Sequence, residues 1–504
     1  MAKNVAARVA VAMALLGLAG CARVKPQPDY ARTAELIQQR VPVMQVFQPD
    51  EPPAPLPEIA DGLTLEEALQ AALLHNRELQ TAFYDIGVAR ADLVQSQLLR
   101  NPVLSLAGML PEGGGRADVQ VGVGQEIADL WQIPIRKQIA QAVLDQTMLR
   151  VARQAVEVAT MVQENYHRLQ VLKESVRVAQ ENIEIARQSE QLTQARLRAG
   201  QAGKIDADLA RADVLRAELV LIDLDRQRHV AQADLALAMG LMRWPGDDVQ
   251  LEPLPPAQTR PIDVEAFVEL ALAERTDLQA ARRAVEAARA RISEQRLMIF
   301  PSLELGLSLE RVEARSVGAS GAEAGAGMAG QAPMGSTLDN LSRLGIQPRA
   351  PMPRESMIDA MLGPMISAPL PIFDQNQAQI ARAVVLYRQA VTQYEQLARQ
   401  VERDVRAAAA NYTAATRTLV FYDEQLLPQL RQNLESATSA YRAGTSTVFV
   451  VIEAQRMLTM TNTDLYMARM TQLMAADQLE GAIGGRLVRQ RAQAAVPADS
   501  GAGQ

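Results

Sequence analysis

Few side chains in this sequence have the type and spacing that a chemical step requires. The three histidines, His75, His167 and His229, lie far apart and show no metal-ligand spacing, so we expect packing or surface roles for them. The chain contains no Ser/His/Asp grouping, no glycine-rich phosphate loop and no Cys/His cluster. The sequence therefore predicts no enzyme, no catalytic residue and no metal site.

The methionines are the one candidate for metal chemistry. Thioethers are soft ligands that suit Cu(I), and a Gly/Ala-rich insertion, residues 312–355, and the segment after it carry Met328, Met334, Met352, Met357, Met361 and Met365. Methionine is frequent throughout the chain, however, at 20 residues, and such insertions are commonly flexible surface loops. We favour the surface loop, and unchanged copper tolerance in a Met→Ser loop variant would exclude the copper-handling alternative.

The only cysteine, Cys21, ends an N-terminal export signal. Lys3 and Arg8 supply positive charge, Val9 to Gly17 form a short apolar core, and Leu18-Ala19-Gly20-Cys21 follows. This ending resembles the bacterial lipobox, in which the cysteine becomes the lipidated first residue of the mature protein. Ala22 at the next position is, by the same resemblance, compatible with sorting to the outer membrane. We expect a covalent lipid on Cys21 and no other cofactor; the alternative is an ordinary export signal with an incidental cysteine.

Composition favours long helices over a large mixed core, because aromatic residues make up only 4% of the 504 positions. The formal net charge is −7, and no basic patch is interleaved with aromatic residues, so nucleic acid is not an expected partner. No segment after the signal offers the ~20 apolar residues of a transmembrane helix. A part that crosses a membrane would have to consist of strands.

Two long helices are expected from their heptad seams, in which apolar residues alternate in steps of three and four. The first is predicted from Pro134 to Arg198 and the second from Gln379 to Tyr441, and each would be roughly 90–100 Å long. Pro428 should kink the second helix or disturb its hydrogen bonds. The second seam comprises Ile380, Val384, Tyr387, Val391, Tyr394, Ala398, Val401, Val405, Ala408, Tyr412, Ala415, Leu419, Tyr422 and Leu426.

Four segments have the alternation of strands. Two are expected at residues 103–110 and around 119–124, and a weaker one at 358–370. The clearest alternation begins at Pro301, with polar residues between Leu303, Leu305, Leu307 and Leu309. An apolar face opposite a polar one is typical of a strand between lipid and a water-filled lumen.

The chain reads as two copies of one plan. Residues 138–143 (QIAQAV) match 379–384 (QIARAV), and each half is predicted to run helix, strand, strand, long helix, returning helix. The predicted organisation is a signal peptide at 1–20, an anchored segment with a Pro-rich linker at 21–62, a first repeat at 63–250, a linker at 251–261, a second repeat at 262–487 and a disordered tail at 488–504.

Four strands cannot close a barrel, and lipid tolerates no open sheet edge. Several copies must therefore combine their strands, and three copies would supply twelve. The alternative is an all-α coiled coil whose apparent strands are loops, but it leaves the leucine alternation unexplained.

The lipobox, the repeat, Pro371-Ile372-Phe373-Asp374 before the second long helix and the Tyr441-Arg442-Ala443-Gly444-Thr445 turn resemble the TolC-like outer-membrane efflux proteins. The resemblance covers roughly residues 63–485 and is specific only in combination. It implies an α+β membrane protein: a homotrimer with a twelve-stranded outer-membrane β-barrel, four strands per chain, continuous with a periplasmic α-helical coiled-coil barrel. The barrel would contact outer-membrane lipid, and the helical tip would stay closed until a pump assembly engages it.

The same resemblance assigns the candidate sites to the two helix-to-helix turns. Asp206 matches a position in the polar network of the gate and Glu453 an acidic ring position, and a ring of three acids favours cations. This sequence differs from the family at two positions: Ser446 stands where some members have a gate arginine, and Val450 where some have a second acidic ring. The alternative for Asp206 and Glu453 is that they are solvated acids in the first turn of their helices. The turns that would bind the adaptor contain Arg198, Ala199, Gly200, Arg442, Ala443, Gly444 and Thr445.

The predicted function is a passive exit duct of a tripartite efflux system for drugs or metal cations. Its partners would be a periplasmic adaptor (a membrane fusion protein) and an inner-membrane pump. The rivals are an outer-membrane duct for protein secretion and a structural coiled-coil lipoprotein without a pore. A planar-bilayer conductance would distinguish the pore from the scaffold.

Overall fold

The computed structural model describes residues 23–52, 55, 62–110, 118–246, 249–255, 262–315 and 356–486. The signal peptide with Cys21, most of the Pro-rich linker, residues 316–355 of the insertion and the C-terminal tail lie outside the described residues. The chain divides into a helical unit and a sheet unit, the latter made of residues 98–134 and 294–379. Each unit is described by itself.

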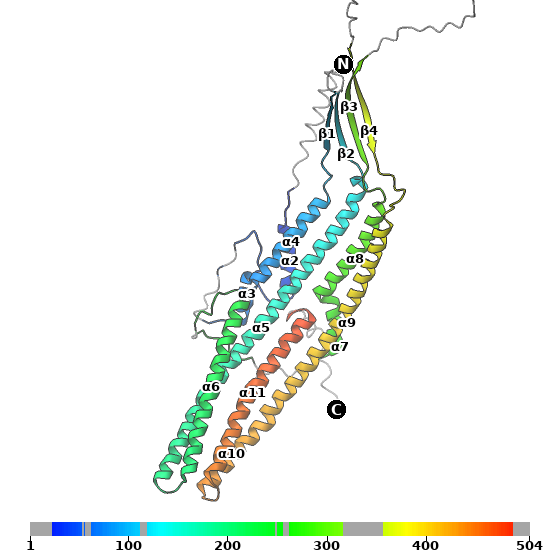
Figure 1. The fold of residues 1–504 in the computed structure, drawn as a ribbon. Helices are drawn as coiled ribbons and strands as arrows, with labels where there is room; N and C mark the ends of the chain where they lie inside the picture. Colours follow the sequence, from blue (N-terminus) through cyan, green and yellow to red (C-terminus); the bar gives the residue numbers. More distant parts are fainter. Residues whose placement is uncertain are drawn as a thin grey trace, which may run out of the picture. The chain divides into compact units, whose positions relative to one another are not determined.

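The helical unit contains two long hairpins (Figure 1). The first pairs α5 (Asp129–Arg198) with α6 (Lys204–Ala238). The second pairs the continuous run α9 (Gln377–Phe421), η2 (Tyr422–Leu426) and α10 (Leu427–Arg442) with α11 (Val448–Ile483). The shorter helices are α2 (Gln27–Gln38), α3 (Leu65–His75), α4 (Arg77–Ser96), α7 (Val264–Glu274) and α8 (Thr276–Leu297).

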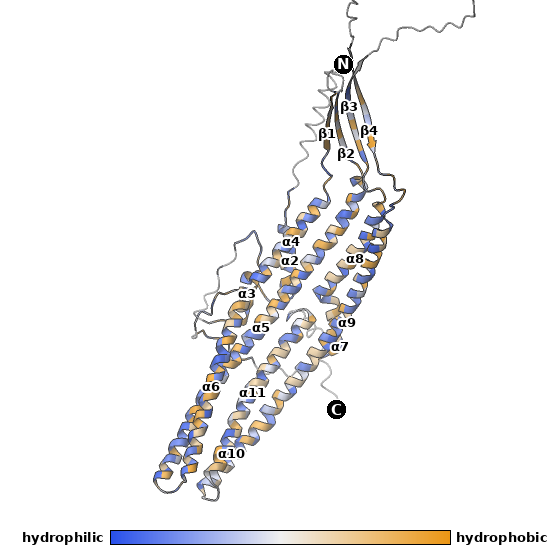
Figure 2. Ribbon diagram, viewed as in Figure 1, coloured by the Kyte–Doolittle hydropathy of each residue, from blue (hydrophilic) through white to orange (hydrophobic). Residues whose placement is uncertain are grey.

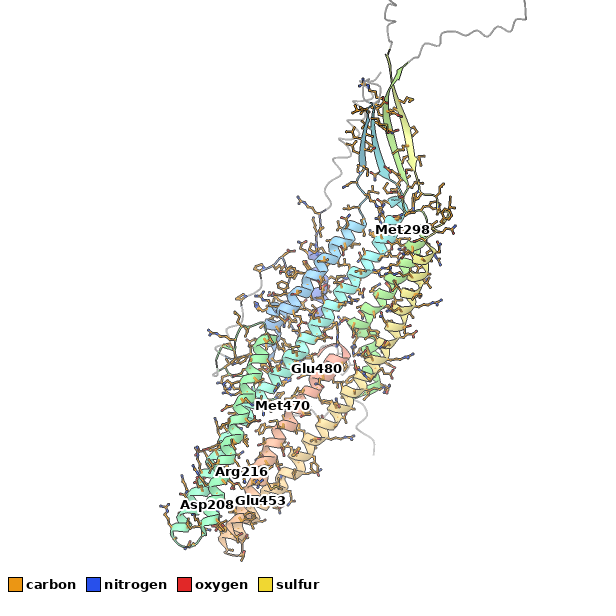
Figure 3. All side chains as sticks on the ribbon, in the orientation of Figure 1. Asp208, Arg216, Met298, Glu453, Met470 and Glu480 are labelled. Carbon is orange, nitrogen blue, oxygen red and sulfur yellow. The ribbon has the colours of Figure 1, made fainter. Side chains whose placement is uncertain are left out.

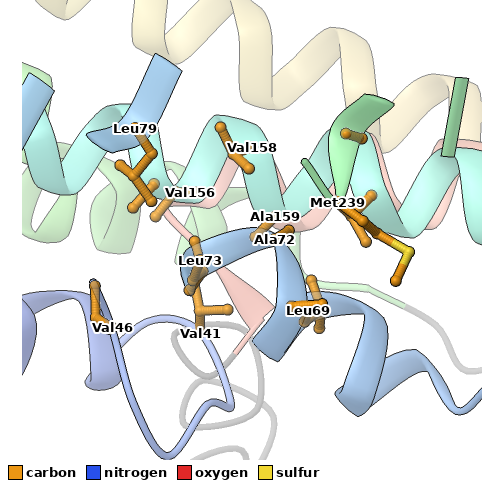
Figure 4. Packing of buried hydrophobic residues seen from close by; sticks show 14 of the residues in the cluster. Val41, Val46, Leu69, Ala72, Leu73, Leu79, Val156, Val158, Ala159 and Met239 are labelled. Carbon is orange, nitrogen blue, oxygen red and sulfur yellow. The ribbon is translucent and has the colours of Figure 1, made fainter. Parts of the chain in front are cut away.

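The predicted heptad seams form the packed stripes of the long helices. In α9, the seam residues Val401, Val405 and Tyr412 are at most 2% exposed, while Ile380 to Ala398 are half-buried in this single chain. The largest core lies where α3 and α4 pack on α5, and Leu69, Leu73, Val156 and Ala159 meet in it (Figure 4). Along each helix, apolar positions alternate with polar ones, as this one-sided burial requires (Figure 2).

Two predicted single helices are in fact pairs of helices. The single helix expected at the start of the first repeat ends at Asn76, whose side chain accepts from Leu79 N–H at 3.1 Å and donates to the Ala238 carbonyl at 3.0 Å. A second break falls at Arg275 between α7 and α8, where the guanidinium donates to the Ala482 carbonyl at 3.3 Å. Both breaks are held by contacts with distant segments, which helical periodicity does not reveal.

Pro428 disturbs the second long helix, as the sequence predicts. Because proline has no N–H, the helical ladder is interrupted just before it, and residues Tyr422–Leu426 form a π-turn in which Leu427 N–H donates to the Tyr422 carbonyl. The first long helix begins at Asp129 rather than Pro134. Asp129 is buried, and its carboxylate accepts a hydrogen bond from Arg100 N–H at 2.8 Å. This contact lies at the start of the helix, before Pro134.

The sheet unit contains four antiparallel strands in the order β1-β2-β3-β4: β1 (Val103–Met109), β2 (Asp118–Glu126), β3 (Glu304–Arg315) and β4 (Ser356–Ser367). The all-α alternative is therefore wrong. β3 also extends to Arg315, so residues 312–315 belong to a strand and not to the predicted insertion.

The element order of two short helices, two strands, a long helix and a returning helix occurs twice along the chain. Each half thus opens with two helices where one was expected. The boundaries 63–250, 251–261 and 262–487 stay predictions.

Candidate functional site: the hairpin turns and the two faces of the sheet

The turn between α5 and α6 is shaped by Gly200 and capped by Asp206. Gly200 has φ +72°, and Gln201 N–H reaches back to the Arg196 carbonyl at 2.8 Å, so the last carbonyls of α5 are satisfied. The Asp206 carboxylate accepts from Gly203 N–H at 2.9 Å at the start of α6. In this chain, Asp206 therefore caps its own helix, and its side chain is half-buried.

The turn between α10 and α11 repeats this geometry. Gly444 has φ +71°, and Thr445 donates from both its N–H and its hydroxyl to the Ala440 carbonyl at 3.0 Å. Glu453 lies in the second turn of α11, where its carboxylate is 3.7 Å from the Arg456 guanidinium and its side chain is 45% exposed. Figure 3 shows Glu453 on α11 and Asp208 on α6 near the ends of the two hairpins.

The two hairpins contact each other close to these turns. The Arg196 guanidinium lies over the Tyr441 ring, 4.0 Å from its centroid, a distance at which a cation is attracted to the aromatic face. Further along, Thr459 on α11 donates to Asn182 on α5 at 3.4 Å. Sequence reasoning missed Arg196, because no local pattern shows which ring a lysine or arginine of another hairpin will meet.

A groove of about 300 Å³ separates the hairpins next to these contacts. Small and apolar side chains line its floor, among them Ala186, Ala210 and Ile452. The predicted turn residues, Arg198, Ala199, Gly200, Arg442, Ala443, Gly444 and Thr445, are exposed at the hairpin ends. The turn residues are therefore accessible to solvent in this chain, and none of them lines the groove.

The sheet presents one apolar and one mixed face. The register pairs Leu307 with Val123 on one side and with Pro364 on the other, and Leu309 with Val121 and Leu362. Paired residues share a face, so these side chains form one apolar surface. Leu305, Leu307 and Leu309 are 44–54% exposed in the single chain.

The opposite face holds Glu310, Ser308 and Gly306, and the register adds Met361 and Met365 to it. Met361 and Met365 are four residues apart on β4, about 13 Å along a strand. This spacing is too wide for both thioethers of one chain to bind one copper ion. Within the described ranges, no group of three or more His, Cys, Asp or Glu side chains is arranged to hold a metal.

No described helix is long and apolar enough to cross a membrane. The open edges of the sheet are β1 and β4, whose outer backbone groups have no strand partner within the described part of the chain. An open edge presents unpaired backbone N–H and C=O groups with which a further strand can pair.

A family model described as "Outer membrane efflux protein" matches residues 68–241 and 267–485. Among curated proteins, Protein CyaE of Bordetella pertussis is 26% identical over 284 residues, which cover 54% of this chain and 59% of that protein. The chain thus matches less than two thirds of the length of that relative.

Solved structures show the same fold. The outer-membrane channel OprN aligns with a TM-score of 0.64 and 18% identity over 88% of this chain and 99% of its own. The outer membrane protein VceC from Vibrio cholerae aligns with a TM-score of 0.63 and 18% identity over 84% and 96% of the two chains. At this identity the likeness concerns the fold alone.

Proposed function

The chain belongs to the outer membrane efflux protein family, and from this premise we propose that it is the exit duct of a tripartite efflux system. The observation that carries the proposal is the double family match, which falls once on each half of the repeated plan. A duct conducts passively, so the proposal contains no chemical step. Substrates would pass from an inner-membrane pump through a periplasmic adaptor into this protein.

The open sheet supports a homotrimer. Three copies would place β1 of one chain beside β4 of the next, and twelve strands would close a barrel with no free edge. The leucine face would then contact outer-membrane lipid, and the face with Ser308 and Glu310 would line the lumen. The half-buried seam residues of α9, from Ile380 to Ala398, would pack against neighbouring helices in a periplasmic barrel.

The two turns are the proposed tip of this duct, where the adaptor would dock and the gate would close. Glu453 of three copies would form an acidic ring, and the Arg196–Tyr441 contact would hold the hairpins of each copy together. We do not assign Asp206 to the acidic ring, because its carboxylate already caps α6 by accepting from Gly203 N–H.

Replacing Glu453 by alanine should raise the single-channel conductance of the purified protein in a planar bilayer and reduce its cation selectivity. The change removes three carboxylates from the proposed constriction, so the pore becomes wider there and loses the negative charge that favours cations. Glu395→Ala, which removes an exposed carboxylate on α9, is the matched control. Unchanged conductance and selectivity in Glu453→Ala would contradict the gate assignment.

We also propose that Cys21 carries the lipid anchor, on the sequence argument alone. Cys21→Ser should leave an unacylated protein that is processed poorly and is lost from the outer-membrane fraction. Intact mass of the purified protein measures this directly. A wild-type mass without acyl chains would show that the cysteine is incidental.

A further inference from the structure

A polar cavity of about 360 Å³ lies in the helical unit, far along the chain from the turns. It is partly open and is lined by residues of α5, of α11 and of the segment 252–255, together with Leu65 of α3 and Tyr412 of α9 (Figure 3 labels Glu480, one of its α11 residues). Gln170, His167, Asp477, Glu480, Glu252 and Arg486 line it. The cavity therefore separates helices that come from the two halves of the repeat.

The segment over the cavity is fastened to α5 by hydrogen bonds. Gln170 Nε2 donates to the Glu252 carbonyl at 2.6 Å, and Lys173 Nζ donates to the Val249 carbonyl at 2.5 Å. The Tyr166 hydroxyl receives Glu252 N–H at 3.2 Å and donates to the Leu63 carbonyl at 2.7 Å. The wall of the cavity is thus built from fixed groups.

The side-chain oxygen of Gln170 is a buried hydrogen-bond acceptor that no donor among the described residues reaches. Gln170 is 4% exposed, its Nε2 donates to the Glu252 carbonyl, and its Oε1 is buried without a hydrogen-bond donor among the described residues. A buried acceptor without a donor is destabilising, and native proteins rarely retain one without a reason. A ligand that donates an N–H would satisfy it.

The charges around the cavity favour a cation. Asp477, Glu480 and Glu252 contribute three carboxylates, against the imidazole of His167 and the guanidinium of Arg486, whose Nη1 is buried without an acceptor among the described residues. Asp477 is 4% exposed, and its Oδ2 lies 2.7 Å from His167 Nδ1. Burial raises the pKa of Asp477 in spite of His167, and the nearby Glu164 carboxylate adds to the rise. A cation in the cavity would offset this cost.

We propose that this cavity binds a small protonated amine, which donates N–H groups to Gln170 Oε1 and to the carboxylates of Asp477 and Glu480. An organic ammonium fits better than a metal ion, because the described residues hold no cluster of three or more metal-ligating side chains. It also fits better than an anion, which the three carboxylates would repel. The proposal does not depend on the duct function.

The test is calorimetric and thermal titration of the full-length protein in detergent, with 1,4-diaminobutane as the probe and 1,4-butanediol as its neutral match. We expect the diamine to raise the unfolding temperature in a saturable way and the diol to leave it unchanged. Asp477→Asn should weaken diamine binding about tenfold or more, because a charge-assisted hydrogen bond is lost. Gln170→Met should also weaken it.

Glu181→Gln is the matched control. Glu181 lies on α5, like Gln170, but its carboxylate pairs with Arg177 at the surface and not in the cavity. It should bind the diamine like the wild type. If Asp477→Asn does not fold, Glu480→Gln replaces it. The proposal fails if the diamine gives no saturable effect, if the diol works equally well, or if Glu181→Gln weakens binding as much as the cavity variants do.

Discussion

Leu307→Arg is expected to abolish the assembled protein in the outer membrane. Leu307 lies on the apolar face of β3 between Val123 and Pro364, and its side chain is 54% exposed in the single chain. In the proposed barrel this exposed surface meets lipid, where an arginine near the middle of the bilayer costs about 2–4 kcal/mol per copy. Three copies would together lose about 6–12 kcal/mol, which is comparable to the whole stability of a typical protein.

The neighbouring position provides the control. Ser308 is adjacent in β3 and lies on the opposite face, so Ser308→Arg changes the charge equally but directs it to the proposed lumen. Heat-modifiable oligomer on gels of outer-membrane fractions measures both variants. We expect oligomer from Ser308→Arg and none from Leu307→Arg. Equal assembly of the two variants would contradict a lipid-facing leucine stripe.

Gly240→Ala is expected to cause a large loss of stability in the helical unit. Gly240 ends α6 with φ +76°, a conformation that costs an alanine about 1 kcal/mol. A Cβ there would also press on the backbone of His75 and lie 2.9 Å from Asn76 N, at the break between α3 and α4. Because backbone atoms cannot move aside as a side chain can, overpacking adds roughly 1–3 kcal/mol.

Gly200→Ala separates the two causes of this loss. Gly200 has nearly the same φ, +72°, but a Cβ there would meet nothing within 4 Å. Its replacement should therefore show the backbone cost alone. Thermal unfolding in detergent, followed by far-UV circular dichroism, should place the midpoint of Gly240→Ala clearly below that of Gly200→Ala, with the wild type highest. Coincident midpoints for the two variants would mean that the contact with His75 and Asn76 is not tight.

The elements of this protein were predictable because their signals are local. Helical steps of three and four identify the stripe that contains Val401, Val405 and Tyr412, and that stripe is buried. Strict alternation identifies β3 from Leu305 to Leu309, but the extension to Arg315 is hidden because its apolar residues, Val312 and Ala314, are out of phase with the leucines. The disturbance of the second long helix at Pro428 was also predictable, because the missing N–H of a proline affects hydrogen bonds within one helical turn.

Contacts between distant segments required the tertiary structure. Asn76 is a favourable N-cap residue, but nothing local at Asn76 or Arg275 shows that each also meets a carbonyl from another part of the chain. For the same reason, the sequence does not reveal that Arg196 covers Tyr441, or that Gln170 and Asp477 meet in one cavity. Periodicity encodes which face of an element is buried, whereas the pairing of faces depends on the free energy of the whole packed chain.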